Sequence, residues 1–146
     1  MKFYSLLILG SASLLLTATA QGGEYTDQVK AQLALVRMAG QNEGWQETHD
    51  NKFDSMDSGD SKTYNITLRS GRSYKVVGVC DNDCSDLDLA IYYNGNLIKK
   101  DQQTDSVPIV EVTPIWTGQF ELKVTMYACS NDPCFYGVSV LGKDEE

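Results

Sequence analysis

Acidic side chains gather in one stretch of this 146-residue sequence. Four aspartates lie close together and two more follow the next turn; they are Asp81, Asp83, Asp86, Asp88, Asp101 and Asp105. Calcium takes ~6–8 oxygen ligands, which carboxylates around a turn can supply. The six residues therefore predict a calcium site, although their spacing is not that of an EF-hand. The alternative is a solvated loop in which the Asp side chains cap turns by accepting hydrogen bonds from backbone N–H groups.

Catalytic chemistry has little support in the sequence. His49 is the only histidine, and no nucleophile motif such as G-x-S-x-G accompanies it. Two carboxylates that cleave a glycosidic bond need a raised pKa in an apolar cleft, whereas these aspartates lie in polar loops. We therefore expect a protein that is not an enzyme, with a hydrolase as the third choice of function.

The four cysteines form two close pairs, which predict the disulfides Cys80–Cys84 and Cys129–Cys134. Two other connectivities are possible, but each of these local pairs brackets a short loop at the end of a strand. Zinc is the alternative, yet the spacings C-x3-C and C-x4-C differ from the paired C-x2-C of four-thiolate sites. Local disulfides of this kind would stiffen the two loops.

Tyrosines supply a second candidate surface. Strand alternation places Tyr92, Tyr127 and Tyr136 on outward faces, where their rings could stack on a glycan or anchor a protein partner. The alternative is that tyrosine is simply a favourable strand residue whose hydroxyl reaches the surface.

The N-terminal part of the chain predicts a leader and then a helix. Residues 1–20 have the charge, the apolar run and the small residues at Ala18 and Ala20 that are typical of a cleaved signal peptide, with an uncleaved anchor as the alternative. Residues 24–41 predict one amphipathic helix, which docks on the rest of the chain or binds a partner. Residues 42–61 are polar and acidic and predict an irregular connector that could include a short strand near Trp45.

From residue 62 the hydrophobic period changes to two. Tyr64, Ile66 and Leu68 alternate with polar residues, and the Asn94-Gly95 pair is typical of a tight hairpin. About seven short strands separated by turns predict a mainly β protein, an antiparallel jelly-roll-like β-sandwich over residues 62–142. Residues 21–61 hold the helix and connector, and residues 143–146 form an acidic tail.

Several motifs in the β-region resemble the bacterial pre-peptidase C-terminal domain family over about residues 60–142. They are Gly71-Arg72-Ser73-Tyr74, the segment from Cys80 to Leu89, Val112-Thr113-Pro114 and Thr117-Gly118-Gln119-Phe120. The resemblance implies a small non-catalytic jelly-roll-like sandwich of exported proteins, involved in secretion, adhesion or substrate contact. It also implies that calcium is bound in some relatives. The two loops bracketed by cysteines are not general to that family.

Charge and composition limit the classes of partner that the protein is expected to bind. The formal net charge is −8, and no basic cluster is present, so nucleic acid is not an expected partner. No segment after the leader is apolar enough to span a membrane. We expect a secreted or periplasmic protein that acts as a binding or accessory module and contacts a protein or a glycan. Calcium is the expected candidate for stabilising this module. The alternative is a structural envelope or periplasmic protein that docks on its partner through the N-terminal helix.

Overall fold

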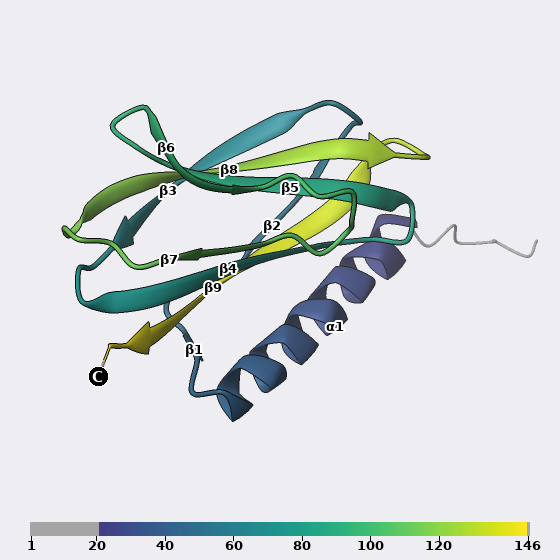
Figure 1. The fold of residues 1–146 in the computed structure, drawn as a ribbon. Helices are drawn as coiled ribbons and strands as arrows, with labels where there is room; N and C mark the ends of the chain where they lie inside the picture. The colour runs from purple at the N-terminus through teal and green to yellow at the C-terminus, as the bar shows by residue number, and fades with distance from the viewer. Residues whose placement is uncertain (1–20, 146) are drawn as a thin grey trace, which may run out of the picture.

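The computed structural model describes residues 21–145, so the predicted signal peptide and its cleavage point after Ala20 lie outside the described residues. The described residues form one helix and two antiparallel β-sheets packed face to face (Figure 1). The predicted β-sandwich is confirmed, and residues 21–145 contain nine strands instead of about seven. Within residues 21–145 no helix is long and apolar enough to cross a membrane.

The first sheet has β9 at its centre. Its strand order is β1-β9-β4-β7, and β2 also pairs with β9. The bounds are β1 Gln46–Glu47, β2 Lys52–Met56, β4 Arg72–Cys80, β7 Ile109–Val112 and β9 Cys134–Asp144. The second sheet has the order β3-β8-β5-β6, with β3 Ser61–Leu68, β5 Cys84–Tyr93, β6 Asn96–Asp101 and β8 Gly118–Cys129.

The two additional strands come from the segment that was expected to be an irregular connector. β1 and β2 both pair with β9, so residues 46–56 are part of the sandwich. β1 is the short strand expected near Trp45, whereas β2 was not expected, because only backbone pairing with β9 orders this polar segment. Its composition gives no period-two signal, although Met56 is buried in the core.

The core lies between the sheets, and the period-two pattern builds it. Alternate residues of β5 and β8 point inward and are almost completely buried; they are Leu87, Leu89, Ile91, Phe120, Leu122, Val124 and Met126. Residues between them therefore project from the outer face of the second sheet. This alternation places the candidate site.

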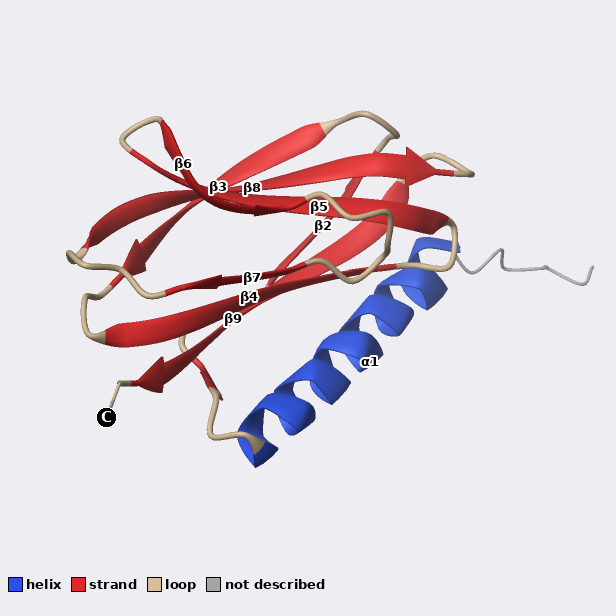
Figure 2. Cartoon of the chain, viewed as in Figure 1, coloured by secondary structure: helices blue, strands red, loops and turns tan. Residues whose placement is uncertain are grey.

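Helix α1, Gln21–Asn42, covers the outer face of the first sheet (Figures 1 and 2). Val29 and Leu33 are buried against Val79, and Gln32 Nε2 donates a hydrogen bond to the Cys80 carbonyl at 2.7 Å. A Cβ atom on Gly137 would lie 2.7 Å from a methyl group of Val29 and collide with it. The predicted docking of the helix on the β-domain is confirmed, and glycine at position 137 permits the close approach.

Both predicted disulfides are present. Cys80–Cys84 joins β4 to β5, and Cys129–Cys134 joins β8 to β9, so each bridge connects one sheet to the other. The two bridges lie at the same end of the sandwich, because Cys84 and Cys129 are register partners in the second sheet. The sandwich is therefore braced at the end that carries the acidic loop.

Candidate functional site

Three of the six aspartates cap turns. Asp81 is 2% exposed, and its carboxylate accepts hydrogen bonds from the backbone N–H groups of Asp83 and Phe135, at 3.0 and 2.7 Å. Asp101 accepts from the N–H groups of Gln103 and Ile109, and Asp105 from that of Val107. These carboxylates already have partners, as the turn-capping alternative expected.

Asp83 belongs to the contact with the helix. Its hydrogen bond and its charge raise the pKa of the Tyr25 hydroxyl above the ordinary value, and the charges of Asp81 and Glu24 act in the same direction. The side chain therefore lies beside the first turns of α1. Within residues 21–145 no group of three or more His, Cys, Asp or Glu side chains is arranged to hold a metal ion. The six aspartates are not assembled into one site.

Asp86 and Asp88 differ from the other four. Leu87 and Leu89 point into the core, so the two aspartates project from the outer face of the second sheet. A bulge between Cys84 and Leu87, where the register of β5 with β8 shifts, positions Asp86. Asp86 is only 5% exposed, and the Oδ1 atoms of both residues are buried without a hydrogen-bond partner. Buried polar atoms without a partner are uncommon and costly.

Asp88 is affected both by burial and by the neighbouring Asp86. Burial, and next the charge of Asp86 and a hydrogen bond to it, raise the pKa of Asp88 to about 6, and Asp101 and Asp105 add repulsion. Two ionised carboxylates have no proton to donate, so this hydrogen bond forms only when one of them is protonated. In the ionised pair both Oδ1 atoms lack a donor or a cation. The pair therefore has capacity to bind a proton, a metal ion or a donor group of a ligand.

The pair lies in a polar surface cavity of about 440 Å³. The other lining residues are Ser61, Gln102, Thr104, Lys123, Thr125 and Tyr127. They come from β3, from β8 and from the loop after β6. No ion pair within residues 21–145 involves either carboxylate, although Lys123 lines the same cavity. Tyr127 is 66% exposed and leaves its ring accessible at the edge of the cavity.

The three tyrosines predicted to face outward differ in their exposure. Tyr127 is exposed as expected, and Tyr92 is half-buried on β5, two positions beyond Ala90 and on the same face as Asp88. The expectation for Tyr136 is wrong, because this side chain is fully buried and its hydroxyl lies 2.5 Å from that of Tyr64. Burial raises the pKa of Tyr136 far above its ordinary value. It belongs to the core and cannot contact a partner.

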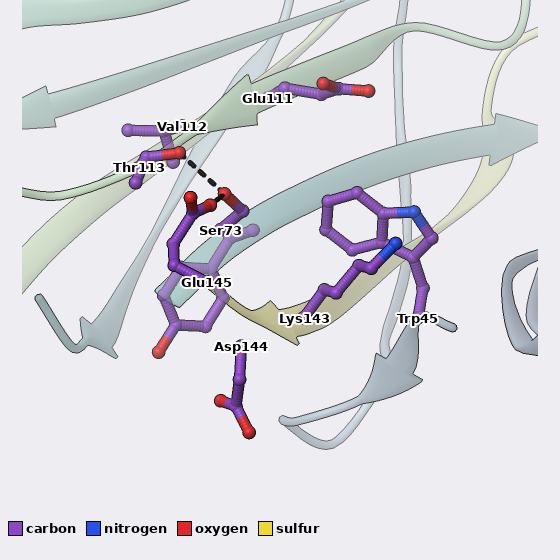
Figure 3. A pocket seen from close by; sticks show the side chains of 9 residues that line it. Trp45, Ser73, Glu111, Val112, Thr113, Lys143, Asp144 and Glu145 are labelled. Carbon is purple, nitrogen blue, oxygen red and sulfur yellow. Dashed lines mark hydrogen bonds between the residues drawn. The ribbon is translucent and has the colours of Figure 1, made fainter. Parts of the chain in front are cut away.

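A second concavity, of about 420 Å³, lies beside Trp45 and the C-terminal residues (Figure 3). Its charged groups already have partners. Lys75 Nζ is 3.2 Å from Glu111 Oε1 and 4.7 Å from the centre of the Trp45 ring, and Lys143 Nζ donates to the Glu43 carbonyl. Glu145 and Thr113 both hydrogen-bond to Ser73. This groove therefore has less capacity for a charged ligand than the cavity at Asp86 and Asp88.

His49 has a structural role in the chain. Its Nε2 atom donates to the Thr67 carbonyl and its Nδ1 atom contacts the Thr48 hydroxyl, both at 2.8 Å. With both ring nitrogens engaged, the imidazole holds the segment between β1 and β2 against β3.

Sequence reasoning missed the residues that complete the cavity. Lys123 and Thr125 stand at outward positions of an alternating strand, so their exposure was predictable. Their position beside Asp88 depends on the register Asp88↔Thr125, which no local pattern specifies. Gln102 and Thr104 come from an irregular loop with no periodic signal.

No protein-family model matches the chain, and no curated protein is detectably similar to it in sequence. The resemblance to the pre-peptidase C-terminal domain family therefore stays a prediction from its motifs.

Proposed function

We propose that the protein is an exported, non-enzymatic binding module that contacts a glycan through the outer face of the second sheet, with calcium at Asp86 and Asp88. One observation carries this proposal. One carboxylate oxygen of Asp86 and one of Asp88 are buried without a partner, and both residues line a polar cavity. A ligand that supplies positive charge or hydrogen-bond donors would satisfy both atoms.

Calcium suits the charge of the pair. Two carboxylates balance its two positive charges, and Gln102 and Thr104, whose side chains carry oxygen atoms, line the same cavity. Water would supply the remaining ligands, because no third carboxylate joins the pair among the described residues. The repulsion that raises the pKa of Asp88 would be replaced by attraction to the ion.

A glycan suits the surroundings of the pair better than a protein does. The lining is made of carboxylate, amide and hydroxyl groups, with one accessible ring at Tyr127. A small number of polar groups beside an aromatic ring is enough to orient a hydroxylated ligand. An apolar pocket for a protein side chain is absent from this lining.

The other candidate functions have less support. Val29 and Leu33 of α1 are buried against the chain's own sheet, so this face of the helix is occupied within the molecule, while Leu35 and Met38 are exposed. A hydrolase using His49 would need an imidazole nitrogen free for proton transfer, whereas both nitrogens have partners. The two disulfides support an oxidising compartment, secreted or periplasmic. The sandwich fold is compatible with the pre-peptidase C-terminal domain family, which we propose as its relative.

Binding to an array of neutral and acidic glycans, with calcium and with EDTA, tests the proposal. We expect binding in calcium that Tyr127→Ala weakens about tenfold or more, as loss of a central aromatic contact does. Ile115→Ala, which removes an 81% exposed apolar side chain elsewhere, is the control and should bind as the wild type does. Absence of glycan binding under both conditions, with a protein partner captured in its place, would contradict the glycan assignment.

A further inference from the structure

A basic cavity lies on a different side of this acidic protein. It has a volume of about 490 Å³, and its lining residues are Gln46, Glu47, Thr48, His49, Thr67, Arg69, Arg72 and Tyr74. Arg69 and Arg72 are two of only three arginines in a chain of net charge −8, and the single histidine lies beside them. Two arginines thus lie close together in this cavity, while the other basic residues of the chain are Arg37 and nine lysines. An anionic ligand is the type that such a cavity would attract.

Arg72 is held in place but lacks a full set of partners. A Cβ atom on Gly142 would lie 2.8 Å from Arg72 Nε, so the guanidinium rests against the backbone of β9. Arg72 Nε is buried and has no aligned hydrogen-bond acceptor. Asp144 Oδ1 lies 3.4 Å from this nitrogen, but the two are not aligned for a hydrogen bond and the Asp144 side chain is 86% exposed. Because the protein itself covers Nε, a ligand would contact Arg72 through the exposed part of the guanidinium; the side chain is 27% exposed.

The single acid that lines the cavity does not meet this need. Glu47 Oε1 accepts a hydrogen bond from Asn51 Nδ2 at 3.1 Å. The imidazole of His49 is fixed by Thr48 and Thr67 and forms part of the wall. Within the described residues, Arg69 takes part in no ion pair and Arg72 is paired only with the exposed Asp144, so both guanidinium groups have donors available to a ligand.

We propose that this cavity binds the carboxylate of an acidic glycan, a uronate. A guanidinium group presents its N–H donors in a planar fork that matches the two oxygens of a carboxylate. Gln46 lines the same cavity, and its side-chain amide suits the hydroxyls of a sugar ring. Its one large apolar residue, Tyr74, is 2% exposed, so no apolar surface remains for a peptide side chain. The inference extends the proposed glycan binding to a second face and does not require calcium.

Calorimetric titration with an oligogalacturonate, in EDTA, tests the inference. The methyl-esterified oligosaccharide is the matched ligand, because it keeps the sugar and removes the charge. We expect the acid to bind and its ester to bind at least about tenfold more weakly. Arg69→Gln and Arg72→Gln should each weaken binding of the acid by about tenfold or more. Arg37→Gln, at the third arginine, which is exposed on α1, should change nothing.

Several outcomes of this titration would argue against a uronate site. Equal binding of the ester, equal binding by the arginine variants, or no binding of the acid would overturn the inference. Binding of a tripeptide with a free C-terminal carboxylate in place of the uronate would also overturn it. If Arg72→Gln lowers the thermal stability, Arg69→Gln still tests the binding of the uronate, because Arg69 is exposed. EDTA separates this site from the calcium-dependent one, so either proposal can fail alone.

Discussion

Replacing Leu33 with alanine should lower the free energy of unfolding by about 2–5 kcal/mol, the cost of removing a buried leucine side chain and leaving a cavity. Leu33 is 2% exposed and packs with Val29 and Val79 between α1 and the first sheet. The helix is therefore part of the folded unit. Denaturant unfolding followed by circular dichroism measures the change directly.

Leu35 provides the matched control, because it lies on the same helix and is 65% exposed. Leu35→Ala should change the free energy of unfolding by less than about 0.5 kcal/mol. Equal effects of the two substitutions would contradict the docked helix. That result would favour a helix that is free to bind a partner.

Asp88→Asn should stabilise the calcium-free protein at pH 7.5 and remove part of its pH dependence. The fold raises the pKa of Asp88 from 3.8 to about 6, so the folded state holds this proton more tightly than the unfolded state. The associated stability is fully present below pH 3.8 and is lost as the pH rises through about 6. An asparagine amide can donate to Asp86 at every pH and avoids the repulsion.

The measurement is the difference in melting temperature between Asp88→Asn and the wild type, in EDTA, from pH 4 to pH 7.5. We expect the difference to grow in favour of the variant as the pH rises through about 6. Asp50→Asn, at an exposed aspartate between β1 and β2, should show no such trend. A difference that is constant with pH would show that Asp88 does not bind its proton more tightly in the fold.

Much of the fold could be predicted, because the strongest signals are local. Alternation in β5 and β8 identifies the inward residues, and the Asn94-Gly95 pair locates the β5–β6 hairpin. The position of each close cysteine pair around a short loop at a strand end favoured the two disulfides that are present over the other connectivities. The short strand expected near Trp45 is β1, but β2 could not be predicted, because only pairing with β9 makes a strand of its polar residues.

Tyr136 shows a limit of alternation. β9 is covered on both faces, by α1 on one side and by the second sheet on the other, so its apolar run is nearly continuous. In such a strand, the sequence does not show whether the odd-numbered or the even-numbered residues face the core between the sheets. Phe135 faces the helix, and Tyr136 therefore lies in the core.

The candidate site could be predicted in part. The sequence identifies the acidic residues and also the two roles open to them, turn cap and ligand. Which aspartate has which role depends on distant backbone donors, such as the N–H of Phe135 that binds Asp81. The bulge at Asp86 and the register beside Thr125 are likewise set by the fold. Local spacing carries no information on either.

Calcium titration of the protein at pH 7.5, followed by calorimetry and by the melting temperature, tests the central claim most directly. We predict one ion per chain and a stabilisation of about 2.7 kcal/mol when the calcium concentration is 100 times the dissociation constant. Asp86→Asn should lose both signals, whereas Asp50→Asn should keep them. If adding calcium gave no heat of binding and no change in melting temperature, a cation site at this carboxylate pair would be contradicted. Equal calcium binding by Asp86→Asn and the wild type would contradict it as well.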